Sequence, residues 1–263
     1  MGRKTIHKRG VLVISSGSSN MEAIRVSLGS IENMISEEFK DWEVRRAFTS
    51  EAIIEKLRKN SGIIVDNVEK ALKKMNVEGF ENVILQPLHI IPGSEYEKIV
   101  ETLKKYKTIF KNIALGRPIL YYEKDYKRAL DALRTQVPCL NHDEAVVLVG
   151  HGTKHTSNIF YKRFQEIIDE EGLRFYVVTL DEYPTIYDII SKLKKDEVRK
   201  IFLMPFMLFF GGHGMRDIAG DKDDSLKNIL KREEFEVSIY EHGLGENIEY
   251  QKIYLQHVKD VMY

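Results

Sequence analysis

The sequence predicts an α/β protein of two lobes related by a pseudo-twofold repeat, each with a parallel sheet of about four strands flanked by helices. Short β-branched runs alternate with longer charged segments of helical periodicity, which is typical of βαβ units. The same order of runs then occurs a second time. Residues 11–18 (VLVISSGS) match 146–153 (VVLVGHGT), and residues 83–93 (VILQPLHIIPG) match 201–211 (IFLMPFMLFFG). The two halves are therefore expected to share one architecture.

Strands and helices are predicted to alternate through both halves. In the first half, strands are expected at residues 10–15, 42–48, 82–86 and 118–122. Helical periodicity there predicts helices at residues 21–39, 50–59, 67–78 and 94–107. In the second half, strands are expected at residues 145–150, 175–180, 200–204 and 236–240. The helices of that half are expected at residues 157–171, 185–195, 222–232 and 247–262.

A boundary between the lobes is predicted between residues 136 and 144, a stretch that holds Pro138, Asn141 and two acidic residues. The expected domains are residues 1–136 and residues 137–263, and the second is expected to carry a metal site.

Composition narrows the class of function. Forty basic residues balance forty acidic ones, which argues against a dedicated nucleic-acid binder but allows a local basic pocket. The single cysteine, Cys139, excludes an internal disulfide and a cysteine-cluster metal site. No run reaches the roughly 18 apolar residues of a membrane helix, and the basic start lacks a signal-peptide core. We therefore expect a cytoplasmic protein with no membrane or nucleic-acid partner.

Chemically capable side chains follow three strands of the second half. Ligands bind at the carboxyl ends of open parallel sheets. The residues that follow these strand ends are His151, the acidic pair Asp181 and Glu182, and His213. Two imidazoles and a carboxylate suit Co²⁺, Ni²⁺, Fe²⁺ or Zn²⁺, and an imidazole also serves as a base near neutral pH. The residues alone leave open whether these histidines only bond to backbone.

Further candidates lie on neighbouring loops. His155 is expected to support the site, because Gly152 and Thr153 predict a loop rather than one helix face shared with His151. His89 follows a strand of the first half, and it is open whether it lines a pocket, ligates a bound metal macrocycle or is a loop histidine. Arg45 and Arg46 point to opposite faces of a strand, so at most one of them faces any given pocket.

Other polar residues are expected to be structural. The loop at residues 15–20 opens a helix, where backbone N–H groups attract anions, but a plain helix cap is the alternative. Residues 214–225 are expected to be a long acidic loop in which Asp221 caps the next helix, with a site for a second cation as the alternative. Four histidines off the strand ends are expected at the surface: His7, His142, His242 and His257. No Walker loop or complete Gly-x-Gly-x-x-Gly fingerprint occurs, so no nucleotide cofactor is expected.

Several motifs occur in order over about residues 10–260. They are EVRRAFTS (43–50), QPLHIIPG (86–93), GHGTKH (150–155), MPFML (204–208), GH (212–213), DIAGD (217–221) and GLGEN (243–247). With these motifs the chain resembles the anaerobic-type sirohydrochlorin cobalt chelatases, within the class II tetrapyrrole chelatases that include ferrochelatase.

The resemblance implies two Rossmann-like, chelatase-type lobes that hold a tetrapyrrole between them and insert Co²⁺ without a nucleotide, in the anaerobic cobalamin pathway. It places metal ligands at His151 and His213. The family's glutamate falls on Asp181, and Glu182 takes that place after a one-residue slip. His151 is expected to accept a pyrrole N–H proton. The residues expected to contact the substrate are Ser15, Ser16, Gly17, Ser18, His89, Ile90 and Ile91.

Alternatives stay open at this point. The same scaffold can insert Ni²⁺ or Fe²⁺, because N/O ligands discriminate poorly among these ions. A two-lobed carrier that holds a metal or a tetrapyrrole without chemistry is the alternative of a different class. The physiological metal, the choice between sirohydrochlorin and precorrin-2, and the formation of a homo-oligomer are not set by the sequence.

Overall fold

The computed structural model describes residues 8–262, apart from the side chain of His213. The first half contains β1 (Lys8–Ser15), α1 (Met21–Ala23), the π-helix η1 (Ile24–Leu28), α2 (Gly29–Glu38), β2 (Glu43–Phe48), α3 (Glu51–Ser61), α4 (Val68–Val77), β3 (Phe80–Pro87), α5 (Ser94–Tyr106), β4 (Asn112–Leu115) and α6 (Glu123–Arg134). The second half contains β5 (Glu144–Gly152), the 3₁₀ turn η2 (Thr156–Asn158), α7 (Ile159–Glu170), β6 (Phe175–Asp181), α8 (Ile186–Lys195), β7 (Lys200–Pro205), α9 (His213–Ala219), α10 (Leu226–Arg232), β8 (Glu236–Ile239), the 3₁₀ turn η3 (Leu244–Glu246) and α11 (Ile248–Lys259). In this range no helix is long and apolar enough to cross a membrane.

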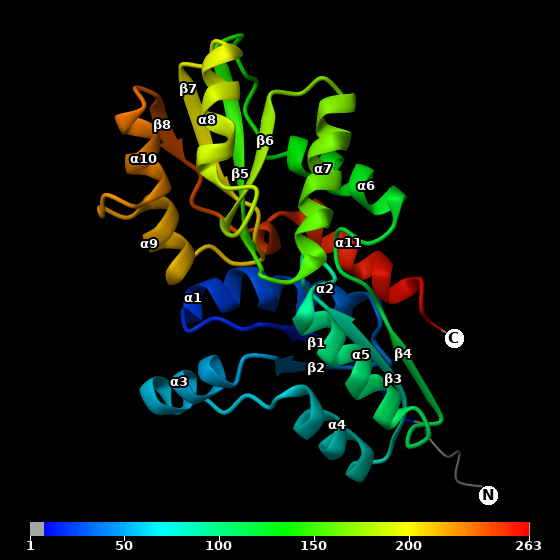
Figure 1. The fold of residues 1–263 in the computed structure, drawn as a ribbon. Helices are drawn as coiled ribbons and strands as arrows, with labels where there is room; N and C mark the ends of the chain where they lie inside the picture. Colours follow the sequence, from blue (N-terminus) through cyan, green and yellow to red (C-terminus); the bar gives the residue numbers. More distant parts are fainter. Residues whose placement is uncertain (1–7, 263) are drawn as a thin grey trace, which may run out of the picture.

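The two halves form two four-stranded parallel sheets of the same topology (Figure 1). Their strand orders are β2-β1-β3-β4 and β6-β5-β7-β8, so each half places its first strand second in the sheet. The central strands β1 and β5 are almost entirely buried, as expected when helices cover both faces of a parallel sheet. The predicted fold class of two α/β lobes is confirmed.

One hydrophobic core runs through both lobes. It joins residues of β1 and β3 to residues of β5, α7 and α11. The other face of each sheet has one hydrophobic cluster of its own. Helix α11 belongs to the second half but packs against α2 and β3 of the first (Figure 1). Its fully buried Tyr250 and Tyr254 donate hydrogen bonds to the carbonyl oxygens of Ala129 (2.8 Å) and Leu88 (2.9 Å). The lobes are thus joined by packing as well as by the chain between them.

A buried ionic cluster fastens the far end of α11 to the first lobe. Arg117 donates two hydrogen bonds to Asp125, of 2.7 and 3.0 Å, and a third to Asp260. His257 is fully buried, and its Nδ1 lies 2.9 Å from the carbonyl oxygen of Arg117. Burial alone raises the pKa of Asp125, but His257, Arg117 and the Tyr122 N–H outweigh it and hold this pKa well below its usual range. The surface position expected for His257 is therefore wrong.

Three other expectations are corrected. The fourth strand of the first sheet is β4, not residues 118–122, where the buried Ile119 and Leu120 donate backbone hydrogen bonds to the loop carbonyls of His89 and Ile90 instead. Helix α9 occupies part of the predicted loop 214–225. Ser225, not Asp221, caps α10 by accepting a hydrogen bond from the Asn228 N–H. Helix α6 was not predicted at all.

Removing the central carboxylate of the ionic cluster tests its contribution to stability. The Asp125→Ala variant is expected to lower the free energy of unfolding by about 3–5 kcal/mol, because it leaves the buried Arg117 without its main partner. Urea unfolding followed by circular dichroism measures this loss. Asp131→Ala on the exposed face of the same helix is the control and is expected to change stability by about 0.5 kcal/mol or less. Equal losses in the two variants would contradict the assignment.

Candidate functional site

His151 and Asp181 lie side by side where two neighbouring strands end. The ladder between β5 and β6 pairs Gly152 with Asp181, which brings the side chain of His151 next to that carboxylate. His151 Nδ1 lies 3.3 Å from the Gly152 carbonyl oxygen and 3.5 Å from Asp181 Oδ2. A hydrogen bond to this carbonyl oxygen requires the tautomer with the proton on Nδ1, which leaves the lone pair on Nε2. Both side chains are largely exposed, at 66% and 59%, so Nε2 is open to a ligand.

A buried threonine, Thr179, holds the loop that carries Asp181 in its conformation by hydrogen bonding. The Thr179 hydroxyl lies 2.9, 2.7 and 3.2 Å from the carbonyl oxygens of Asp181, Glu182 and Pro184 and donates to this cluster. The chain turns sharply there, because Glu182 has a φ of 64°. Gly152 has a φ of 78°, and a Cβ on it would lie 2.1 Å from the Asp181 carbonyl oxygen. This close packing fixes Asp181 beside His151. Sequence reasoning missed Thr179, since nothing in the local pattern marks it.

The third expected ligand is only partly described. The backbone of His213 begins α9 directly after Gly212, but its side chain lies outside the described part of the structure. The loop before it is anchored by η3, where Leu244 N–H donates to the Met207 carbonyl (2.8 Å) and Gly245 N–H to the Leu208 carbonyl (3.1 Å). Among the side chains that the structure describes, no group of three His, Cys, Asp or Glu could hold a metal ion. The described site therefore offers two donors, from His151 and Asp181.

The serine-rich loop after β1 uses most of its described polar contacts to stabilise its own conformation. Ser15 is buried and accepts a hydrogen bond from the Gly17 N–H (3.2 Å), and Ser18 accepts one from the Asn20 N–H (3.1 Å). Asn20 caps α1, and Gly211, two residues before His213, lies close to its side chain. Ser16 is exposed. The loop thus reaches the second lobe, with Ser16 as the hydroxyl that is turned to solvent.

His89 lies at the strand end of the first lobe that was expected to face the site. Both ring nitrogens are shut off from solvent without a hydrogen-bond partner, and burial lowers the pKa of His89 to about 4, although the charge of Glu95 opposes this shift. The imidazole is therefore neutral near neutral pH. Ile90 beside it is a core residue, and Ile91 is half-buried against the same core.

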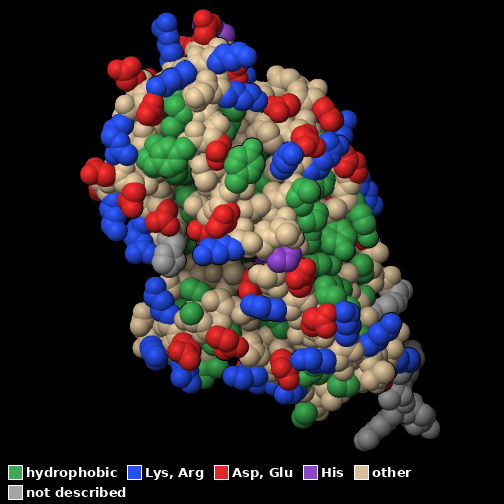
Figure 2. Space-filling model, viewed as in Figure 1, with side chains coloured by type: hydrophobic (Ala, Val, Ile, Leu, Met, Phe, Trp, Pro, Cys, Tyr) green, Lys and Arg blue, Asp and Glu red, His purple; other side chains and the backbone are tan. Residues whose placement is uncertain are grey.

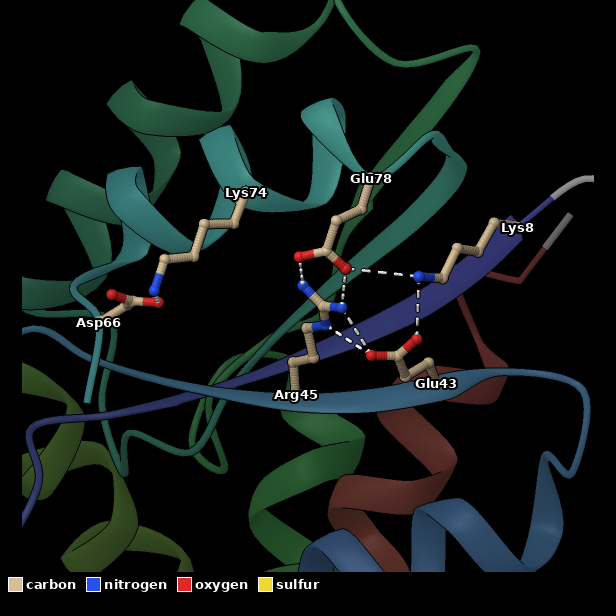
Figure 3. A network of polar contacts seen from close by, with 6 residues as sticks. All are labelled: Lys8, Glu43, Arg45, Asp66, Lys74 and Glu78. Carbon is tan, nitrogen blue, oxygen red and sulfur yellow. Dashed lines mark hydrogen bonds and ion pairs between the residues drawn. The ribbon is translucent and has the colours of Figure 1, made fainter. Parts of the chain in front are cut away.

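Neither arginine of the second strand is free for a ligand, and Figure 3 shows the ion pairs made by Arg45. Arg45 bonds to Glu43 and Glu78 at the amino ends of β1 and β2, the sheet edge opposite the strand-end loops. Its guanidinium lowers the pKa of Glu78 to about 2. Arg46 points to the other face and pairs with Glu32 at 2.8 Å. The expectation that they face opposite sides holds, and both are used in structural ion pairs.

Comparison with known proteins adds family relationships to this geometry. The family model described as cobalt chelatase (CbiK) matches residues 9–263. The chain is 33% identical over 255 residues to the sirohydrochlorin cobaltochelatase of Salmonella typhimurium, covering 97% of both proteins. It is 30% identical over 257 residues to sirohydrochlorin cobaltochelatase CbiKC of Nitratidesulfovibrio vulgaris, covering 95% of this chain and 89% of that protein.

Solved structures share the fold at lower identity. SirB from Bacillus subtilis, solved with Fe³⁺, superposes with a TM-score of 0.62 and 17% identity, over 96% of this chain and 95% of that one. CbiX, described as the terminal enzyme of siroheme biosynthesis in denitrifying bacteria, superposes with a TM-score of 0.57 and 12% identity, over 97% of this chain and all of that one. At these identities the likeness is one of fold alone.

The loop that holds Asp181 is testable through its threonine. Thr179→Val removes the hydroxyl that bonds the loop carbonyls, so divalent-cation affinity is expected to fall about 10- to 100-fold. Titration calorimetry with Co²⁺ measures the change. Thr179→Ser keeps the hydroxyl and is expected to bind like the wild type. Normal affinity in the valine variant would show that the threonine does not position the carboxylate.

The buried imidazole predicts a pH dependence of stability. A folded-state pKa of about 4 for His89, against about 6.5 in the unfolded chain, makes the folded state lose stability as pH falls from about 7 to about 4. The loss is up to about 3 kcal/mol. His89→Gln cannot titrate, so the stability difference between wild type and variant is expected to shrink by that amount over this range. Chemical denaturation at several pH values checks it, and a pH-independent difference would refute the buried neutral state.

Proposed function

Because the chain belongs to the cobalt chelatase (CbiK) family, we propose that it inserts Co²⁺ into the tetrapyrrole sirohydrochlorin without a nucleotide, in cobalamin biosynthesis. The observation that carries the proposal is the end-to-end match: the family model and the curated relatives cover both lobes and their strand-end loops. The absence of a Walker loop or dinucleotide fingerprint supports a reaction without ATP.

The reaction needs a base and a place to hold the cation. Insertion exchanges two pyrrole N–H protons for one divalent ion, so two protons must leave as the metal enters. In this proposal His151, Asp181 and His213 hold Co²⁺ before transfer. Transfer to the macrocycle frees the imidazole of His151, which then accepts one pyrrole proton while the second passes to solvent. Asp181, 3.5 Å from Nδ1, stabilises the resulting imidazolium.

The first lobe supplies the other wall of the substrate site. The exposed hydroxyl of Ser16, on the loop that also holds Ser15, Gly17 and Ser18, is suited to the substrate's carboxylates. Ile91 offers apolar contact to the ring, while the half-buried His89, whose ring nitrogens are shut off from solvent, and the buried Ile90 support this wall. We assign no ligand contact to Arg45 or Arg46, which are paired elsewhere.

The proposal also assigns the two lobes at residues 1–136 and 137–263. Strands β1–β4 lie before this boundary and β5–β8 after it, and α11 returns to pack on the first lobe. In this proposal residues of both lobes form the substrate site, and the metal donors lie on the second lobe.

An insertion assay with Co²⁺, Ni²⁺ and Fe²⁺ tests the function. Absorbance changes with sirohydrochlorin in excess over protein are expected to show repeated turnover, fastest with Co²⁺, and to slow as pH falls because protonated imidazoles can neither ligate nor accept a proton. Binding that stops at one equivalent would instead identify a carrier, and a faster rate with Ni²⁺ or Fe²⁺ would reassign the metal.

Variants of the donors sharpen the same assay. His151→Ala is expected to lower kcat at least about 100-fold, since it removes both a ligand and the base. Asp181→Ala is expected to weaken Co²⁺ binding and turnover more than Glu182→Ala, because Asp181 is the carboxylate beside His151. Near-normal insertion by the His151 variant would remove it from the mechanism. A larger effect at Glu182 would move the carboxylate role by one residue.

A further inference from the structure

Asn158 links the two loops that carry His151 and Asp181. Its Oδ1 accepts a hydrogen bond from the Thr153 N–H (3.0 Å), and its Nδ2 donates one to the Tyr183 carbonyl oxygen (3.2 Å). Each of these two backbone groups lies two residues beyond the expected ligand of its loop. We propose that Asn158 is a positioning residue, which holds His151 and Asp181 at the separation that Co²⁺ binding requires. The inference rests on the metal-binding role that the proposed function gives to these two side chains.

The link continues a strand pairing beyond the point where the backbone ends it. Gly152 and Asp181 are the last partners in the ladder between β5 and β6. Beyond them, an N–H of one chain and a carbonyl of the other are joined through the amide of Asn158. A side-chain amide can both accept and donate, as a peptide group does. Because the Thr153 N–H only donates and the Tyr183 carbonyl only accepts, the two partners together fix the orientation of the amide.

Asn158 does not have the usual role of an asparagine at the start of a helix. It directly precedes α7, where asparagine commonly caps the first turn, but its side chain makes no capping hydrogen bond. The turn that carries it is held by other contacts. The Nδ1 of His155 accepts a hydrogen bond from the N–H of the buried Ser157, and the Thr153 hydroxyl accepts one from the His155 N–H (3.1 Å). The amide therefore extends from a well-held turn toward both loops.

The loop after β6 has little apolar packing to hold it in place. The side chains of residues 181–183 are all exposed, and Tyr183 is 64% exposed. Figure 2 shows hydrophobic side chains that stand in this way among charged ones on one face of the second lobe. The Thr179 hydroxyl bonds three other carbonyls within the loop. Thr179 thus stabilises the loop internally, and Asn158 joins it to the loop of His151.

The separation of the two donors matters because an ion held by both has to meet them at once. His151 Nδ1 and Asp181 Oδ2 lie 3.5 Å apart in the absence of an ion. Ordering mobile groups during binding costs free energy, so a link that already joins the two loops reduces this cost. Without the amide of Asn158, the ion has to order both loops itself. The affinity for Co²⁺ is then expected to fall.

Equilibrium dialysis of inorganic Co²⁺ against the full chain tests the proposal in a double-mutant cycle. Asn158→Ala is expected to lower the affinity about tenfold in the wild-type background. In the Asp181→Ala background it is expected to lower the affinity less than about twofold, because the carboxylate to be held beside His151 is gone. Asn76→Ala, at an exposed position of α4 in the first lobe, is the matched control and is expected to bind like the wild type.

Hydrogen exchange of backbone amides, measured without metal, tests the link itself. In Asn158→Ala the Thr153 amide loses its acceptor and is expected to exchange at least about tenfold faster. The amide of Leu148, in the middle of β5, is expected to exchange as in the wild type and shows that the fold is retained. Unchanged exchange at Thr153 would overturn the link.

The outcomes separate this inference from the proposed function. No loss of affinity in Asn158→Ala, or an equal loss in both backgrounds of the cycle, overturns the positioning role even if the protein inserts Co²⁺ into sirohydrochlorin. A loss confined to the background that retains Asp181 supports the role even if sirohydrochlorin is not a substrate. A wild type that binds no Co²⁺ overturns both this inference and the proposed metal site.

Discussion

The shared core between the lobes is the constraint on which the rest of the structure depends. Two parallel sheets could each be covered by their own helices, but here the inner cluster continues from β1 and β3 through α11 into β5 and α7. Apolar burial of this kind is non-directional. The buried hydroxyls of Tyr250 and Tyr254, however, donate hydrogen bonds to backbone carbonyls of the first lobe, and these bonds fix the position of α11 against that lobe. The loops at the two sets of strand ends are consequently held at a set distance from each other.

Within that frame, parallel pairing itself assembles the chemistry. In a parallel ladder neighbouring strands end at the same edge, so a histidine near the end of β5 and an acid at the end of β6 become neighbours without any local sequence relationship. The Thr179 turn and the absence of a side chain at Gly152 then set the position of the carboxylate. His151 and Asp181 thus have a rigid backbone and exposed side chains, as the proposed metal-binding role requires.

The sequence predicted the sheets, the repeat and the placement of His151 and Asp181 at neighbouring strand ends because these depend on periodicity and order along the chain. Prediction from the sequence failed where contacts between residues far apart in the chain determine the local structure. Residues 118–122 look like a strand because they are apolar, but their backbone groups bond to the loop at His89 and Ile90. His257 looked like a surface residue because its partner, the carbonyl of Arg117, is 140 residues away. The turn of the chain around Thr179 requires Glu182 to take the left-handed backbone conformation, which glutamate rarely adopts.

The return of α11 to the first lobe also affects how the polypeptide acquires its shape during synthesis. The face of α2 and β3 that this helix covers remains bare while the ribosome makes the entire second half, although the first sheet is by then complete in sequence. On its own, the amino-terminal lobe would leave that apolar face exposed to water. This surface is withdrawn from water only after residues 248–259 have been made and pack against it.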